Sequence, residues 1–466
     1  MASKIELAEI RSMRPRMFGI AFFFAWCLTM FFDAGHAPHD AFLSFASCVG
    51  NVLGLACIWA MSARYEALYR SRWFCWGSAV VVGAATVFVG LAGCVGSPLP
   101  NAFYGICGFL TGIGSSGVSV VWGCYYSGLD HPKALLSVLG SCAMGVALYA
   151  ATALLLHSLA LMVMGVLLVC GGVMSHRCIV QQGPGTVRGH TASSMRGFVK
   201  RTWRGVIAMF VLGVVFWTFW FGRMHWGGGM DSVHPIAFLI VSVCMVVMAC
   251  IGRFNTEVML QVCLVTSILG VAITFGLSSD FEPAGLMLSL LAYICMDAYL
   301  IILLCEGVRE SGCNPVRGFS LGRSVDATAV LLGAVLSAAA ERFGVNESTM
   351  AFPLFIMVAV VVAMNLMMDS HSRSRLRESQ EEDGAAASAV LFARRCKSAI
   401  VQYGLSPREA EIMLLITQGR SIPYVADTLH IARSTAKTHV TSMYKKMGVA
   451  SRQEMLDLIE SLPVEQ

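Results

Sequence analysis

The run AGLMLSLLAYICMDAYLIILLCE, residues 284–306, decides the fold class of this chain. It is long enough for one helix to cross the hydrocarbon core of a bilayer, which takes about 20 mostly apolar residues. Similar runs fill residues 1–369, and the whole chain of 466 residues is 56% hydrophobic and only 13% charged. Soluble globular chains contain roughly 45–50% apolar and 25% charged residues. The composition therefore excludes an ordinary soluble protein and a disordered one, and it predicts a membrane protein.

The apolar runs predict about twelve membrane-spanning helices. We place them at residues 16–34, 41–62, 74–93, 101–127, 134–155, 158–175, 204–222, 233–251, 257–277, 284–306, 324–341 and 351–369. The longest inner connection, residues 177–203, is polar and basic and divides the spans into two groups of six. The predicted fold is therefore all-α, with a polytopic membrane helix bundle in a 6+6 layout within residues 1–369.

The distribution of lysine and arginine predicts the orientation of the bundle. With the amino terminus inside, the inner connections hold eighteen of these residues, whereas the outer connections hold only Arg223 and Arg342. Cytoplasmic loops of membrane proteins carry an excess of lysine and arginine. We therefore expect a multi-pass protein of the cytoplasmic (inner) membrane with both termini in the cytoplasm.

The 6+6 layout with a cytoplasmic central loop resembles the major facilitator superfamily of transporters. The connection between the second and third spans reads ARYEALYRSR, without the Asp-Arg-x-Gly core that this family usually carries there. The matching loop between the eighth and ninth spans keeps only Gly252 and Arg253. The resemblance implies a transporter-like scaffold, and the missing motif weighs against transport.

The rest of the chain has the composition of a water-soluble region. We expect a cytoplasmic linker at residues 370–400 and a soluble domain of four short helices at residues 401–466. The segment VLFARRCKSAIVQY, residues 390–403, could add one more short helix.

Short local signals place the helices of this soluble domain. Ser406 with Glu409, and Ser451 with Glu454, have the spacing of a capping box, in which each side chain satisfies a backbone N–H of the other residue. Gly448 is positioned to end the third helix. Two capping boxes in one short region predict a compact helical domain.

The third of these helices, at residues 433–447, carries the functional signal. Its apolar stripe faces the core and consists of Ala436, Val440, Met443 and Met447. Its other side is basic and rich in hydroxyl groups, which suits the second helix of a helix-turn-helix in the DNA major groove. Lysine and threonine can contact base edges, whereas lysine and arginine at the rim suit phosphate contact. The residues that we predict to bind DNA are Arg433, Ser434, Thr435, Lys437, Thr438, Thr441, Lys445, Lys446 and Arg452.

Residues 405–461 resemble the LuxR-type (NarL/FixJ) family of helix-turn-helix domains, over about one-eighth of the chain. The match runs through Leu405-Ser406-Pro407-Arg408-Glu409, Gly419, Ala426, Ile431, Thr435, Lys437-Thr438-His439-Val440, Tyr444-Lys445-Lys446 and Gly448-Val449. By this resemblance Lys437, Thr438 and Thr441 fall where the family contacts base edges. Thr435 and the lysines near the helix end fall where it contacts phosphate. The resemblance implies double-stranded DNA as a partner and dimerisation through the last helix.

Three features depart from the pattern of the family. Ala432 stands where a Ser, Thr or Asn often caps the recognition helix, and losing such a cap costs about 1 kcal/mol. Pro423 and Tyr424 replace a pair that is usually charged, and Ala436 is smaller than the usual Val or Ile. None of these changes removes Lys437.

Ionisable side chains within the spans are candidate signal-sensing residues, because charge in hydrocarbon is costly. Asp297 lies in the middle of its apolar run; it either binds a ligand or proton, or hydrogen-bonds to a neighbouring helix. Asp33, Arg223 and His225 lie near outer ends of spans, where a solvated loop or an interfacial aromatic belt is the alternative. No spacing typical of a catalytic or metal site occurs. We therefore predict no catalytic residues, no metal, no cofactor and no enzyme activity.

Together these features predict a membrane-bound, one-component transcriptional regulator of a prokaryote. The membrane bundle, embedded in the lipid bilayer, would sense an unknown small-molecule signal. The soluble domain would bind double-stranded DNA as a homodimer. The alternative is a major-facilitator-type transporter with a regulatory DNA-binding or interaction tail.

Overall fold

The computed structural model describes residues 13–32, 40–65, 67–95, 99–182, 192–226, 235–251, 256–276, 281–345, 356, 358–359, 362 and 391–463. Contacts between residues divide the chain into two compact units, Met1–Asn365 and Leu366–Gln466. Each unit has a hydrophobic core of its own.

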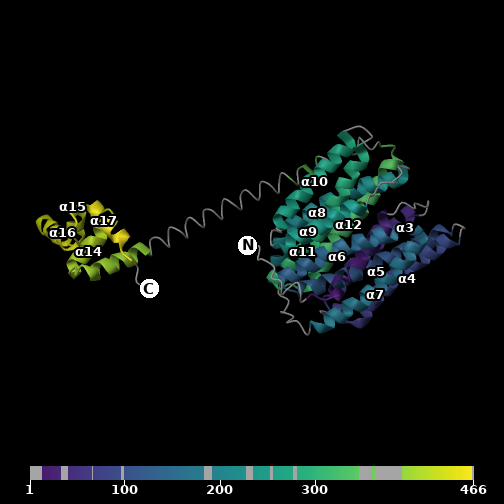
Figure 1. Ribbon diagram of the computed structural model, residues 1–466, viewed down its shortest axis with the longest axis horizontal. Coiled ribbons are helices and arrows are strands. Elements are labelled where there is room, and N and C mark those ends of the chain that lie inside the picture. The colour runs from purple at the N-terminus through teal and green to yellow at the C-terminus, as the bar shows by residue number, and fades with distance from the viewer. Residues whose placement is uncertain are drawn as a thin grey trace. The chain divides into compact units, whose positions relative to one another are not determined.

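The first unit is a bundle of long apolar helices (Figure 1). Its elements are η1 (Pro15–Phe18), α2 (Ala21–Phe32), α3 (Asp40–Met61), η2 (Leu68–Arg70), α4 (Arg72–Cys94), α5 (Asn101–Ser127), α6 (His131–Thr152), α7 (His157–Gln181), α8 (Ala192–Trp226), α9 (Pro235–Cys250), α10 (Thr256–Gly276), α11 (Glu282–Ser311) and α12 (Pro315–Arg342). Among the described residues, nine helical segments are long and apolar enough to cross a membrane, and shorter apolar helices lie at Leu239–Cys250 and Val258–Thr274. All elements of the described part are helical, which confirms the predicted all-α membrane bundle.

The predicted spans can be compared with these helices one by one. Eleven of the twelve, from residues 16–34 to residues 324–341, coincide with a described helix. The twelfth, at residues 351–369, lies almost entirely outside the described residues. The length and composition of the apolar runs therefore located the helices correctly wherever the structure describes them.

Like α8, which begins at Ala192 rather than at residue 204, α12 begins well before its predicted span, at Pro315. Asn314 caps this helix, because its side-chain oxygen accepts from the backbone N–H of Val316 at 2.8 Å and of Arg317 at 3.3 Å. The eighteen lysines and arginines that the sequence analysis counts in inner connections include Arg317 and Arg323, because both precede the predicted span at residues 324–341. In the structure both arginines belong to α12, just as Arg196, Lys200, Arg201 and Arg204 belong to α8.

Glycines of α5, among them Gly112 in the stretch TGIGSSG at residues 111–117, let this helix approach α3 closely. A Cβ atom on Gly112 would lie 2.1 Å from the backbone oxygen of Ser47, and one on Gly108 would lie 2.3 Å from that of Leu43. Helices in a membrane are held together largely by van der Waals packing, so small residues at the interface allow more contact. The missing side chains at these positions thus set the spacing of α3 and α5.

We expect Gly112→Ala to destabilise the bundle by about 1–3 kcal/mol, because the new methyl group overlaps the backbone of α3. Gly77→Ala is the matched control, since no atom lies within 4 Å of the Cβ position of Gly77 in α4. Thermal unfolding of the two purified full-length variants measures the difference. Equal midpoints for the two variants would contradict the close approach.

The second unit begins, among the described residues, with a helix at 391–402. The four predicted helices follow as α14 (Pro407–Thr417), α15 (Ile422–Thr428), α16 (Arg433–Met447) and α17 (Arg452–Ser461). Cys396 and Ala399 of the first helix are buried in the same core as side chains of α14, α16 and α17. The packed part of the unit therefore includes residues that the sequence analysis assigned to the linker.

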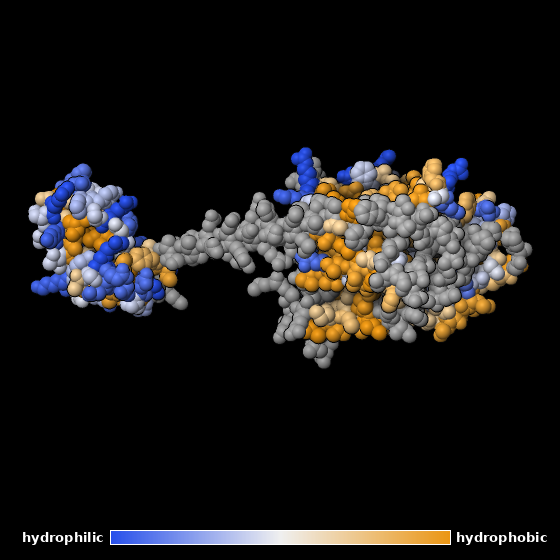
Figure 2. All heavy atoms as spheres, turned by 90° about the horizontal axis from the view of Figure 1, so that it is seen from above, coloured by the Kyte–Doolittle hydropathy of each residue, from blue (hydrophilic) through white to orange (hydrophobic). Residues whose placement is uncertain are grey.

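The two units have surfaces of different polarity (Figure 2). In the view shown, apolar side chains gather over described helices of the first unit, whereas the surface of the second unit is mainly hydrophilic. Exposed apolar residues of the first unit include Trp73, Ile106 and Val166, which are 72%, 63% and 59% exposed. This contrast is expected of a polytopic membrane region that shares a chain with a domain in water.

Candidate DNA-binding surface and membrane cavity

The apolar side of α16 holds this helix in the core of the second unit. The buried side chains are those of the predicted stripe, Ala436, Val440, Met443 and Met447. Gly448 follows the helix with a φ of 68°, a left-handed conformation that glycine adopts without a Cβ clash. The stripe determines which side of α16 remains in contact with solvent.

The opposite side of α16 is exposed and contains no acidic residue. The structure leaves at the surface all the residues that we predict to bind DNA: Arg433, Ser434, Thr435, Lys437, Thr438, Thr441, Lys445, Lys446 and Arg452. The hydroxyl groups of Thr438 and Thr441 donate to the backbone oxygens of Ser434 and Lys437, each at 3.0 Å. Both threonines therefore still offer an oxygen as an acceptor and a methyl group as an apolar contact.

Lys446, a predicted phosphate contact, is paired within the domain. Its Nζ lies 2.6 Å from Oε2 of Glu409 in α14, and Ser442 of α16 donates to Oε1 of the same carboxylate at 2.7 Å. The backbone N–H of Ser406 also donates to Oε2, at 2.8 Å, and so completes the predicted capping box. Glu409 is only 3% exposed. This carboxylate therefore connects the start of α14 to α16 and helps to orient the exposed helix.

The same donors control the ionisation of Glu409. Burial alone would raise its pKa, but hydrogen bonds from Lys446, from the backbone of Ser406 and from Ser442 lower the pKa to about 2. A carboxyl group whose pKa is lower in the folded than in the unfolded state stabilises the fold above its unfolded-state pKa. That contribution is lost as the pH falls through the folded-state value.

We therefore expect the free energy of unfolding of a fragment carrying residues 391–463 to fall between pH 4.5 and about 2. Glu409→Gln should destabilise the fragment at neutral pH, because Lys446 loses its charged partner, and should remove this part of the pH dependence. Glu460→Gln is the matched control, since Glu460 is exposed on α17. Urea unfolding followed by circular dichroism across this pH range tests the expectation. A Glu409→Gln profile parallel to that of the parent fragment would refute it.

At the starts of α17 and α16 the structure agrees only in part with the caps that the sequence predicts. The amide of Glu454 donates to Ser451 at 3.2 Å, and the amide of Ala450 donates back to the Glu454 carboxylate at 2.8 Å. Ala432 begins α16 without a side-chain cap, as its residue type implies. The first turn of α16 therefore presents backbone N–H groups that no N-cap side chain satisfies.

The first unit contains a cavity of about 150 Å³ between helices of both halves of the bundle. Helices α2, α3, α5 and α6 line it from the first half, and α8, α11 and α12 line it from the second. Aromatic side chains form much of the wall, among them Phe23, Phe24, Phe31, Phe32, Trp217 and Tyr293. A polar strip includes Asn51, whose amide donates to Ser115 at 2.8 Å.

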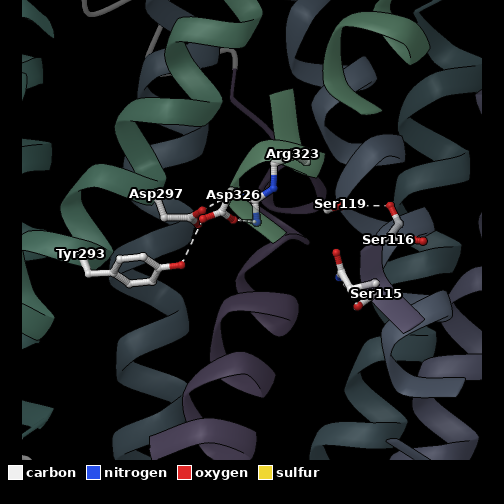
Figure 3. Close-up of polar contacts among 8 residues, drawn as sticks. Ser115, Ser116, Ser119, Tyr293, Asp297, Arg323 and Asp326 are labelled. Atoms are coloured by element: carbon white, nitrogen blue, oxygen red, sulfur yellow. Dashed lines mark hydrogen bonds and ion pairs between the residues drawn. The ribbon is translucent and has the colours of Figure 1, made fainter. Parts of the chain in front are cut away.

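Three ionisable side chains meet in the wall of this cavity (Figure 3). Arg323 of α12 pairs with Asp297 of α11, and its other terminal nitrogen lies 3.5 Å from Oδ2 of Asp326. Tyr293 of α11 donates to Oδ1 of Asp326 at 3.1 Å. Figure 3 shows the guanidinium group directed at the two carboxylates, with serine side chains of α5 on the other side. Arg323 thus bridges two carboxylates where an unpaired charge would be costly.

The structure describes the side chain of only one of the four candidate sensing residues. Asp297 lies in the cavity wall, in an ion pair with a neighbouring helix. Asp33 lies outside the described residues. Arg223 and His225 belong to α8, but their side chains lie outside the described part. Only Asp297 is therefore placed at a site.

Sequence reasoning missed Arg323 and Asp326 as members of this site. Their i, i+3 spacing is the available signal, because residues three apart on a helix are neighbours. Tyr293 lies one turn before Asp297 on α11 and gave no separate signal, since tyrosine is common in apolar helices.

The C-terminal region also matches known regulators. Residues 404–459 match the family model of bacterial regulatory proteins of the luxR family. These residues are a LuxR-type helix-turn-helix domain. The probable transcriptional regulatory protein NarL of Mycobacterium tuberculosis is 47% identical over 58 residues, which are 12% of this chain and 27% of NarL. The HTH-type transcriptional regulator MalT of Yersinia pestis is 40% identical over 58 residues, 12% of this chain and 6% of MalT. The chain spans only these small shares of the two relatives, so the relationship concerns the LuxR-type domain alone.

The first unit resembles transporters of known structure. A bacterial homologue of the iron transporter ferroportin, in the outward-facing state, aligns with 77% of this chain and 97% of its own, with a TM-score of 0.50 and 13% identity. The major facilitator superfamily transporter FucP, in the outward conformation, aligns with 76% and 98%, with a TM-score of 0.48 and 12% identity. Likeness at such low identity concerns the fold alone. The LuxR-type domain therefore shares its chain with a membrane region whose fold resembles that of the bacterial ferroportin homologue.

Proposed function

We propose that this protein is a membrane-bound, one-component transcriptional regulator. The observation that carries the proposal is the exposed basic side of α16, within a LuxR-type domain on the same chain as a membrane bundle. A helix of this shape and charge fits the major groove of DNA. The two regions resemble regulators and transporters, and we propose neither a catalytic step nor a cofactor.

The proposed contacts divide α16 into two parts. Lys437, Thr438 and Thr441 face base edges, because they are exposed in the middle of the helix and combine donors, acceptors and methyl groups. Lys445 and Arg433 lie toward the two ends of α16, where they suit phosphate contact. The ion pair of Lys446 with Glu409 gives that lysine a second role, which is to hold α16 in position.

The proposed partner of each DNA-bound domain is a second copy of the same chain. Two LuxR-type domains on a two-fold operator would each place one α16 in a major groove, about one helical turn apart. The excess of lysine and arginine in the predicted inner connections supports a cytoplasmic position for these domains. DNA binding would then take place next to the cytoplasmic (inner) membrane.

The proposed signal site is the cavity of the first unit. Residues of both halves line it, so its shape depends on how the halves are arranged. A ligand shifts a protein between two conformations only if it binds one of them more tightly. We propose that this difference changes the pairing of the two LuxR-type domains on DNA.

Replacing Lys437 with alanine should abolish specific DNA binding in cells, because the exposed centre of α16 loses its only lysine donor there. Lys397→Ala is the matched control, since Lys397 is an exposed lysine on the helix at 391–402. Crosslinking of the full-length proteins to DNA in their own cells, followed by sequencing, gives the measurement. We expect discrete sites that persist in the control and disappear with Lys437→Ala at equal amounts of protein in the membrane. Sites that persist in both variants would count against α16 as the recognition helix.

Lys445→Ala should act differently from Lys437→Ala. Loss of a phosphate contact weakens binding to operator and unrelated DNA alike, and it lowers the slope of log K against log salt by about 1. Loss of a base contact lowers the preference for the operator by about 1–3 kcal/mol. Fluorescence anisotropy with both DNAs over a salt series separates the two effects. The same loss of preference in both variants would contradict the assigned roles.

A transporter with a regulatory tail is the second candidate, because the bundle aligns with nearly the whole length of a solved transporter-fold structure. Under this alternative, cells accumulate an external compound even when residues 401–466 are deleted, and Asp297→Asn abolishes the accumulation. Under the regulator proposal the same deletion abolishes gene regulation, and no accumulation accompanies it.

A further inference from the structure

We infer that the cavity of the first unit binds a compact organic monocation, with its ammonium group at the cluster of Asp297, Arg323 and Asp326. The inference rests on the proposed role of the cavity as the signal site, and it adds the chemical class of the signal. Four features of the described lining support it: charge, free acceptor capacity, aromatic walls and volume.

The charge of the lining favours a cation. The described lining contains two carboxylates, on Asp297 and Asp326, and one guanidinium, on Arg323, so with all three groups ionised its formal net charge is −1. An unbalanced charge away from water is unfavourable, and a monocation restores neutrality. An anion would double the imbalance, and a neutral ligand would leave it unchanged. The charge of the site therefore selects against carboxylates and phosphates.

The carboxylate of Asp297 has room for a second donor. Its hydrogen bond to Arg323 uses Oδ1, and its side chain remains 17% exposed within the lining of the cavity. Asp326 is more fully occupied, because Tyr293 donates to one oxygen and Arg323 lies near the other. An ammonium group, which carries several N–H donors, can use Oδ2 of Asp297 without breaking the existing pair.

Aromatic rings surround the same space. The ring of Trp217 lies 5.5 Å from that of Phe31 and 5.7 Å from that of Tyr293, measured between centroids, and all three residues line the cavity. Ring faces attract a cation within about 6 Å of the centroid. Trp217 is only 4% exposed, and its indole N–H makes no hydrogen bond of normal geometry to the described residues. The aromatic wall therefore suits a cation at this place.

The volume limits the size of the ligand. A cavity of about 150 Å³ is of the size that holds one benzene molecule. The part of the ligand inside the cavity is therefore an amine on a body of about one six-membered ring. This combination of size and charge defines a narrow set of compounds for a direct test.

The test uses compounds with the same ring and different charge. Full-length protein in phosphatidylcholine nanodiscs, which carry no net lipid charge, is titrated with benzylamine, phenethylamine and cyclohexylamine. The matched neutral compounds are benzyl alcohol, phenethyl alcohol and cyclohexanol, and the matched anions are benzoate, phenylacetate and cyclohexanecarboxylate. Calorimetry measures binding, and tryptophan fluorescence reports on Trp26 and Trp217, which line the cavity. We expect at least one amine to bind about tenfold or more tightly than its alcohol and its acid.

Variants of Asp297, Arg323 and Asp326 test whether the ammonium group binds at this cluster. Asp297→Asn and Asp326→Asn each bring the net charge of the lining to zero and should weaken amine binding about tenfold or more. Asp297→Asn combined with Arg323→Gln returns the charge to −1 and should regain binding relative to Asp297→Asn alone. Glu310→Gln is the matched control, because Glu310 is an exposed acid on α11 that pairs with Arg201 outside the cavity. The thermal midpoint of each variant shows that it is folded.

Several outcomes would overturn the inference. These are binding of no amine to folded protein, equal binding of the alcohols or acids, and equal amine binding in Glu310→Gln and the two single Asp variants. DNA occupancy, measured in parallel, tests the proposed function separately. Amines that bind at the cluster without changing occupancy would support the site and refute the signalling role. A neutral or anionic compound that binds in the cavity and changes DNA occupancy would support the signalling role and refute the inferred cation.

Discussion

Hydrocarbon offers no hydrogen-bond partners to a peptide backbone, and the rest of this molecule depends on that constraint. A chain crossing a bilayer must satisfy every backbone N–H and C=O internally, and a helix of apolar residues does so. The constraint acts along one segment at a time, so it is visible in the sequence as long apolar runs. Helices then hold together through close packing. The glycines of α5 allow this packing, because the backbone of α5 can lie directly against the backbone of α3.

The same constraint explains why charge is concentrated in one place. An ionised side chain at membrane depth needs a partner, and Arg323 lies within ion-pair distance of both Asp297 and Asp326. Asp297 could be singled out from the sequence because a single acid interrupts an apolar run. Its partner could not, since Arg323 lies 26 residues away and meets Asp297 only when α11 packs beside α12. Counting arginine as a sign of a connection does not suit Arg323, which lies in the cavity wall beside the two carboxylates that pair with it.

In the LuxR-type domain, too, contacts between residues close in the sequence could be predicted and contacts between distant residues could not. The Ser406–Glu409 capping box and the stripe of α16 involve residues a few positions apart, and the structure contains both as predicted. The pair of Lys446 with Glu409 spans 37 positions, and its existence depends on how α14 packs against α16. Exposure of the basic side of α16 follows from burial of its stripe. Which of the exposed residues contact bases stays a prediction, because that depends on the DNA.

Sensing and transport place opposite demands on the cavity. A transporter must release what it binds, so the affinities of its two conformations for the substrate must remain similar. A sensor gains from unequal affinities, because moving an equilibrium from 1:99 to 99:1 requires about 10⁴-fold tighter binding to the favoured state. In this bundle Asp297 and Asp326 are on two helices of the same half, and Arg323 already neutralises one of them. The aromatic wall includes α2 of the other half. A cation held between the charge cluster and that wall would favour the arrangement in which the two halves are closest, and thus one conformation over the other. The ion pair that makes charge tolerable in the membrane would then also make the cavity better suited to sensing than to transport.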